Sequence, residues 1–214
     1  MDRQCCLLGH QERWFVLKNS LQLGFTLIEL LVALAIFGIL MAVGIPSFSA
    51  WTQNSQIRTA AGAIQNGLQL ARAEAVRRNT LIRFQLTDSI ASGCALSTGD
   101  TNWVVSFDDP AGLCNLPLLD DSASVATAAA PRMIQIRPAT EGSNRVVAVA
   151  NQSTVIFNGL GRLSAVAPAV APSPFSVELQ PSTGSARNLR VNVSLGGQIR
   201  LCDDNLPAGD PQKC

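Results

Sequence analysis

The sequence predicts an α+β fold in which one long N-terminal helix packs on an antiparallel β-sheet domain. An apolar run and then a stripe of helical period occupy residues 25–78. Short segments that alternate apolar and polar residues follow over 80–214, joined by turn-forming residues. This period of two is typical of antiparallel strands with one covered face. The long helix should therefore cover that face with its second half.

The first half of the helix has the length and composition of a membrane segment. Phe25 to Ile45 reads FTLIELLVALAIFGILMAVGI and contains one charge, Glu29. At about 1.5 Å per residue the run spans roughly 30 Å, the thickness of a bilayer hydrocarbon core. It is too long for the apolar part of a signal peptide. Pro46 removes a backbone donor and crowds the preceding turn, so we expect a helix kink there.

The second half, residues 47–78, is predicted as an amphipathic helix. Its apolar positions recur at steps of three and four residues, which places them on one face. These positions are Ile57, Ala61, Ile64, Leu68, Ala71 and Ala75. The pattern ends at Arg77, Arg78 and Asn79. Basic residues are favoured in the last turn of a helix, and asparagine is favoured just after it.

Seven or eight strands are expected after the helix, in a β-rich region over 80–214. Their alternating apolar positions are Ile82, Phe84 and Leu86; Trp103, Val105 and Phe107; Ile134 and Ile136; Val147 and Val149; Val155 and Phe157; Phe175, Val177 and Leu179; Leu189, Val191 and Val193; and Ile199 and Leu201. Gly196-Gly197 favours a hairpin turn. Asp108–Pro131 and Gly159–Pro174 are expected to be loops, either solvated connections or surfaces for partners.

Composition excludes most enzyme classes. The formal charge is +1, too small for a bulk polyanion binder, and the only histidine is His10. A chain that loses its first 24 residues would contain no histidine, which removes His-based triads, His metal sites and His general bases. We therefore expect a non-enzymatic protein without a cofactor or metal.

Four of the six cysteines follow residue 24. They are Cys94, Cys114, Cys202 and Cys214, and no CxxC zinc pattern occurs among them. In an exported domain an even count indicates two disulfides, for which three connectivities exist. Proximity favours Cys94–Cys114 and Cys202–Cys214, each stabilising by about 3 kcal/mol in the loop-entropy model. Four buried free thiols are the alternative.

The residues around the start of the apolar run resemble a known processing signature. Gly24-Phe25-Thr26-Leu27-Ile28-Glu29-Leu30-Leu31-Val32 is similar to the prepilin signature of type IV pilins and type II secretion pseudopilins. The resemblance implies that 1–24 is a leader, that a prepilin peptidase cuts between Gly24 and Phe25, and that the Phe25 amine is methylated. It also implies that Glu29 neutralises the N-terminal amine of a neighbouring subunit. Unpaired amine and carboxylate groups in hydrocarbon are both costly, which agrees with such pairing. The alternative is an acid that snorkels to the membrane interface.

Looser motifs resemble the FimT/GspH branch of minor pilins and pseudopilins. They are Leu70 to Asn79, Trp103 to Asp108, Val155 to Arg162, and Gly196 to Asp203. The branch implies a pilin-like fold and a minor component that helps to initiate a type IV pilus, or else a type II secretion pseudopilin. It implies residues 25–46 as a single inner-membrane pass and 47–214 as a periplasmic domain. The expected partners are other pilins or pseudopilins, the prepilin peptidase and the inner-membrane assembly platform.

A third hypothesis is a DNA-binding subunit at the pilus tip. Some FimT-like proteins resemble DNA receptors with a Gly-Arg-any-Arg motif, but Gln198 replaces the first arginine here. Arg187, Arg190 and Arg200 still supply three bases that could contact phosphate. Acids follow at 203, 204 and 210, and no aromatic residue lies beyond Phe175 to stack on bases. A solvated strand face is the alternative interpretation.

Overall fold

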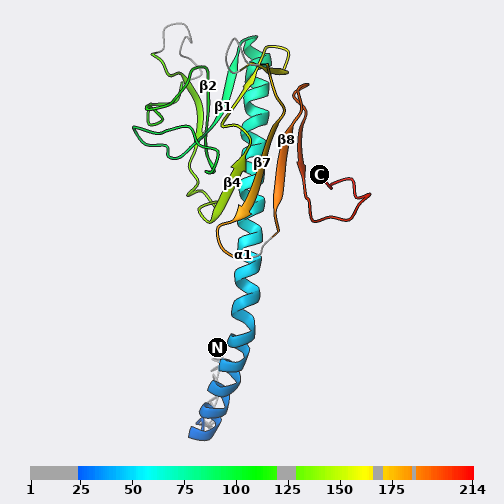
Figure 1. Cartoon of the computed structure of the whole chain (residues 1–214). Helices are drawn as coiled ribbons and strands as arrows, with labels where there is room; N and C mark the ends of the chain where they lie inside the picture. The colour runs from blue at the N-terminus through cyan, green and yellow to red at the C-terminus, as the bar shows by residue number, and fades with distance from the viewer. Residues whose placement is uncertain (1–23, 120–128, 166–170, 185–186) are drawn as a thin grey trace, which may run out of the picture. The chain divides into compact units, whose positions relative to one another are not determined.

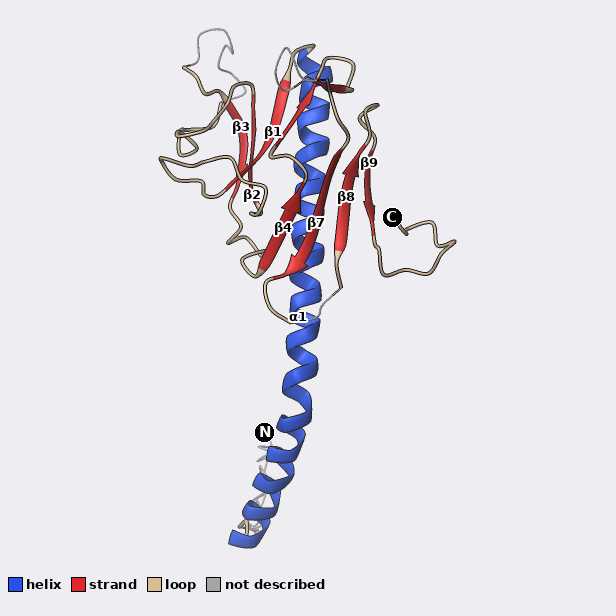
Figure 2. Cartoon of the chain, viewed as in Figure 1, coloured by secondary structure: helices blue, strands red, loops and turns tan. Residues whose placement is uncertain are grey.

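The computed structural model describes residues 24–119, 129–165, 171–184 and 187–214, with side chains omitted at 43–47. These parts contain one long helix and nine strands (Figures 1 and 2). The elements are α1 (Leu27–Arg78), β1 (Ile82–Thr87), β2 (Asn102–Ser106), β3 (Met133–Arg137), β4 (Val146–Ala150), β5 (Thr154–Phe157), β6 (Leu163–Ser164), β7 (Phe175–Pro181), β8 (Leu189–Val193) and β9 (Ile199–Cys202). The predicted leader, apart from Gly24, lies outside the described residues. The chain divides into two units, 1–44 and 45–214, which we describe separately.

The predicted α+β class is confirmed, but the strands form two sheets where one was expected. The first has the order β3-β2-β1-β5-β6 and the second β4-β7-β8-β9, and every neighbouring pair is antiparallel. The chain leaves the first sheet after β3, adds β4 to the second, and returns for β5. Alternation within each strand carries no information about this crossing, so the sequence could not show it.

The predicted stripe on the second half of α1 is confirmed. All six positions from Ile57 to Ala75 are buried. The helix ends as expected, because Asn79 adopts a left-handed conformation (φ 48°). The N–H of Thr80 donates to the carbonyl of Ala75 (3.2 Å) and that of Asn79 to Val76 (3.3 Å), the two bonds of a Schellman motif.

The main core lies between this half of α1 and both sheets. Three aromatic rings occupy its centre: Phe84 of β1 lies 5.6 Å from Trp103 of β2 and 6.5 Å from Phe175 of β7, centroid to centroid. Gly67 of α1 faces this group, where an added Cβ would lie 2.8 Å from the Phe84 ring and 3.0 Å from Trp103. The missing side chain therefore lets the helix approach the first sheet closely.

Two sequence predictions in the strands are corrected. In β4 the buried side chains are Val146 and Ala148, whereas Val147 and Val149 are exposed. The segment RVVAVA is apolar at five successive positions, so its sequence does not define which face is inward. The predicted loop Gly159–Pro174 contains the short strand β6, which pairs with the end of β5.

The first sheet is covered on both faces near β2 and β3, although one covered face was expected. A second, small core on the far side contains Cys94, Val104, Cys114 and Met133, all nearly inaccessible to solvent. The start of the predicted loop Asp108–Pro131 supplies Cys114, so this part packs on the sheet and is not a solvated connection. The disulfide Cys94–Cys114 fixes it there.

Both sheets meet the helix near the turn between β8 and β9. The Nε of Arg72 donates to the carbonyl of Gly161 (3.1 Å). Gly197, with φ +80°, lies so close to that same carbonyl that an added Cβ would collide with it. The N–H of Leu163 donates to the carbonyl of Leu195 (3.1 Å) and joins the edge of the first sheet to this turn.

Candidate functional site

The predicted processing site lies just before the first turn of α1. Thr26 caps the helix: its Oγ1 accepts the N–H of Glu29 (3.3 Å), and its carbonyl accepts that of Leu30 (3.2 Å). Glu29 therefore occupies the first turn, where the helix dipole stabilises a negative charge. Our sequence reasoning missed this second role, although Thr-x-x-Glu is a recognised capping pattern.

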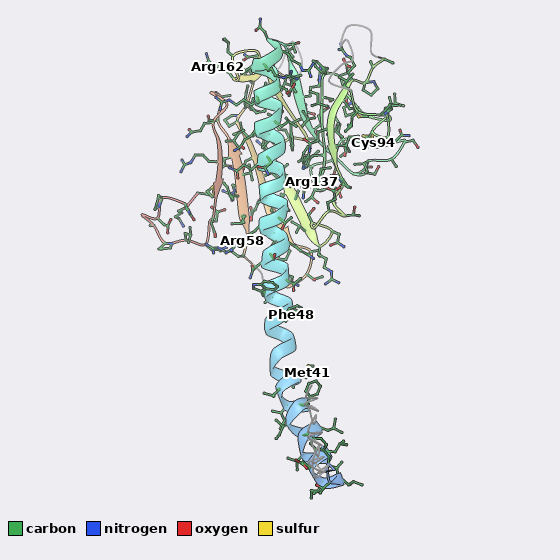
Figure 3. All side chains as sticks on the ribbon, turned by 180° about the vertical axis from the view of Figure 1, so that it is seen from behind. Met41, Phe48, Arg58, Cys94, Arg137 and Arg162 are labelled. Carbon is green, nitrogen blue, oxygen red and sulfur yellow. A yellow bond between two sulfur atoms is a disulfide. The ribbon has the colours of Figure 1, made fainter. Side chains whose placement is uncertain are left out.

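The segment from Phe25 to Met41 exposes apolar side chains around its whole circumference (Figure 3). Those at least 46% exposed are Phe25, Leu27, Ile28, Leu30, Leu31, Val32, Leu34, Ile36, Phe37, Ile39, Leu40 and Met41. A helix that is apolar on all sides requires apolar surroundings on all sides. Within the described residues, Glu29 forms no ion pair. Also within them, no helix combines the length and apolar character that a membrane crossing needs.

An exposed aromatic pair follows the predicted membrane segment. Phe48 and Trp51 are 68% and 66% exposed, and their ring centroids lie 5.9 Å apart. Aromatic side chains with a polar atom, such as tryptophan, are enriched where membrane meets water. Pro46 lies inside α1, which has no break at this position. The kink expected at Pro46 stays a prediction.

The three arginines proposed for DNA are largely engaged within the chain. Arg187 forms an ion pair with buried Asp203. Arg190 pairs with Glu178 (3.3 Å) and with Asp204. Two of the three charges are thus already matched by acids. Arg200 forms no ion pair in the part of the chain that the structure describes, and its Nη2 donates to the carbonyl of Pro211 at 3.5 Å.

The four cysteines are paired as proximity favoured. The structure contains the disulfide Cys94–Cys114 and, at the end of β9, Cys202–Cys214. The first lies in the small core behind β2. The second holds the C-terminal segment beside β9, where the N–H of Asp203 donates to the carbonyl of Gln212 (2.8 Å).

The chain matches the models of two known protein families. The profile of the family described as type II transport protein GspH matches residues 60–197, which is more than half of the chain and includes every strand except β9. The chain belongs to the GspH family. The profile of the prokaryotic N-terminal methylation motif matches residues 19–45. The GspH-family assignment and the processing signature expected at Gly24–Phe25 thus rest on separate parts of the chain.

Individual relatives of this GspH-family chain are pilins. The type IV major pilin PilE1 of Neisseria gonorrhoeae is 50% identical over 42 residues, which cover 20% of the chain and 26% of that pilin. The matched region is thus about a quarter of those pilins. The pilin-like protein PilA1 of Thermus thermophilus is 29% identical over 157 residues, 60% of this chain and 94% of that one. The crystal structure of the minor pilin FimU of Pseudomonas aeruginosa is 18% identical, with a TM-score of 0.44, over 77% of this chain and 98% of FimU.

Proposed function

We propose that this GspH-family chain is a minor subunit of a pilus-type filament. The observation that carries the proposal is the contrast within α1. From Ile57 onward its apolar stripe is buried by the chain's own sheets, whereas its first part is apolar on every side and has no cover among the described residues. Such a segment needs lipid before assembly and other subunits after it. Residues 25–46 would be the inner-membrane segment and 47–214 the periplasmic domain.

Glu29 would fix the position of the subunit in the filament. Cleavage between Gly24 and Phe25 creates a positive amine four residues before this carboxylate. A charge in apolar surroundings is costly unless it is paired, and a pair between two subunits satisfies both groups at one axial offset. Other pilins or pseudopilins would be the partners, and the prepilin peptidase and the assembly platform would act on the precursor.

The contribution of Glu29 can be separated from its role in starting the helix. Glu29→Ala should leave the chain in the membrane fraction but lower its content in sheared filaments at least tenfold, since the remaining amine loses its partner. Thr26→Ala is the matched control, because it removes the cap at Glu29 and keeps the carboxylate. The measurement is quantitative immunoblotting of membranes and filaments. Normal incorporation of Glu29→Ala would contradict the proposal.

The type IV pilus and the type II secretion system are distinguished by deletion. Loss of surface pili without loss of exoprotein secretion assigns the chain to a type IV pilus. The reverse result assigns it to a pseudopilus. Complementation with the Glu29→Ala chain in the same strain ties the phenotype to assembly.

A further inference from the structure

The segment after β9 is folded back beside its own strand. Cys202, at the end of β9, forms a disulfide with Cys214, and the N–H of Asp203 donates to the carbonyl of Gln212 (2.8 Å). Figure 2 shows the C-terminus lying next to β9. Both ends of the segment are thus attached to the second sheet, so the side chains near its end have defined positions relative to the strands.

This segment forms one wall of a hollow on the face of the second sheet that points away from α1. The hollow measures about 620 Å³, within the range of about 300–1,000 Å³ that is typical of small-molecule sites. Its lining includes three side chains that lie directly opposite one another on neighbouring strands: Ser176 of β7, Asn192 of β8 and Arg200 of β9. Their sequence neighbours Phe175 and Val193 belong to the main core, so alternation turns this cross-strand row to the outer face.

Two cations line this hollow, Arg200 from the strand and Lys213 from the folded-back segment. Backbone carbonyls accept hydrogen bonds from both: Arg200 donates to Pro211 (3.5 Å), and Lys213 donates to Asp204 (3.2 Å) and Leu206 (2.8 Å). Within the described residues neither cation forms an ion pair with a side chain or with the C-terminal carboxylate. No Asp or Glu side chain is among the described residues that line the hollow, so its two positive charges are not matched by a side chain there.

The remaining lining favours a ligand that carries hydroxyl groups. Neutral hydroxyl and amide groups come from Ser176, Asn192, Ser194 and Gln198. Such groups both donate and accept hydrogen bonds, as the hydroxyls of a sugar do. Leu195, which is 45% exposed, adds apolar surface for the C–H groups of a sugar ring. The aromatic residue of the lining, Phe175, is 1% exposed, so a nucleobase would find no ring there on which to stack.

We propose that this hollow binds an acidic saccharide, a short chain of uronic acid units. The carboxylates of the sugar would pair with Arg200 and Lys213, and its hydroxyls would bond to the neutral groups of the cross-strand row. A neutral sugar would leave both cations without a partner, and a nucleic acid would leave its bases without a stacking ring. The proposal rests on the hollow and its charges and is independent of the proposed filament.

The test measures binding of trigalacturonate to the full-length chain in detergent micelles by isothermal titration calorimetry. Saturable binding is expected, with a dissociation constant between about 10 μM and about 1 mM for a small ligand held by two charge-assisted pairs. Arg200→Gln and Lys213→Gln should each weaken binding about tenfold, because each removes one pair. Arg145→Gln is the matched control: Arg145 is exposed at the start of β4, outside the lining, and its loss should leave the affinity unchanged.

The folded-back segment supplies a second test. Replacing Cys202 and Cys214 with alanine removes the covalent link that holds Lys213 opposite Arg200. This double variant should therefore lose about as much affinity for trigalacturonate as Lys213→Gln does. Circular dichroism at the temperature of the titration verifies that each variant is folded.

Comparison ligands separate saccharide recognition from charge attraction. Maltotriose has the sugar hydroxyls without carboxylates, whereas the peptide acetyl-EEE-amide and a short oligothymidylate have the same number of charges without the sugar acid. Each should bind at least about tenfold more weakly than trigalacturonate. Absent binding of trigalacturonate to the wild type, equal binding of any comparison ligand, or unchanged affinity in folded Arg200→Gln or Lys213→Gln would each overturn the inference. None of these outcomes affects the Glu29 experiment, which measures assembly, and failure of that experiment leaves this site intact.

Discussion

Gly67 decides how closely α1 lies on the first sheet. Gly67→Ala gains about 1 kcal/mol in helix propensity but forces a methyl group against Phe84 and Trp103, for which overpacking costs about 1–3 kcal/mol. We expect a net loss of about 1 kcal/mol in the free energy of unfolding. Gly62→Ala is the matched control, because an added Cβ there meets nothing within 4 Å. Denaturant titration of the full chain in detergent should show the control stabilised and Gly67→Ala destabilised; equal effects would contradict close packing.

Single residues also show where sequence reasoning stops. The stripe from Ile57 to Ala75 could be predicted because a helix repeats its face every three or four residues. The inward face of β4 could not be predicted in this way, because the exposed Val147 and Val149 are as apolar as their buried neighbours Val146 and Ala148. The pairing of Arg187 with Asp203 needs the register of β8 and β9. Both residues were visible in the sequence, but not their contact.

The loop after β2 is tied to β3 by an ion pair. Arg132 contacts Asp108 through two side-chain bonds of 2.7 Å and through its backbone N–H (3.0 Å). Its guanidinium and that of Arg78 lie over the Phe107 ring, at 5.2 Å and 5.3 Å from the centroid. The hydrogen bonds from Arg132 hold the pKa of Asp108 below its usual value, and burial opposes them. This loop therefore stays in place as long as Asp108 is ionised.

Acidification should weaken the tie. The pKa of Asp108 is lower in the folded chain than in the unfolded chain, where it is about 3.9, so the unfolded chain binds more protons between these values. The stabilisation is present above pH 4 or so and is lost as the pH falls through the folded pKa. Denaturation midpoints at about pH 5 and about pH 3 should differ less in Asp108→Asn than in the wild type. Glu141→Gln, at an exposed acid 3.7 Å from Arg137, should behave like the wild type. An unchanged pH dependence in Asp108→Asn would contradict the assignment.

At the level of elements, the helix and most strands could be predicted from the sequence, but the arrangement of the strands into sheets could not. The helix, its end at Asn79 and most strands follow from periodicity and capping residues. The division into two sheets does not, because strand order depends on contacts between distant segments.

The two disulfides contribute differently to the whole domain. Their sequence separations are 20 and 12, so the loop-entropy model assigns each about 3 kcal/mol. Cys94 and Cys114 also fill the small core with Val104 and Met133. Replacing both with alanine should therefore destabilise the chain more than Cys202→Ala with Cys214→Ala. Chemical denaturation of both double variants under oxidising conditions measures the difference. Equal losses would show that the small core adds nothing beyond loop closure.

The long contact between α1 and the two sheets has a mechanical consequence. Tension applied along the helix axis acts on the buried positions from Ile57 to Ala75 at the same time, as a shear force. It does not separate these contacts one after another. The bonds from Arg72 to Gly161 and from Leu163 to Leu195 spread that tension across both sheets at once. The contact between α1 and the sheets is thus arranged to resist tension along the helix axis.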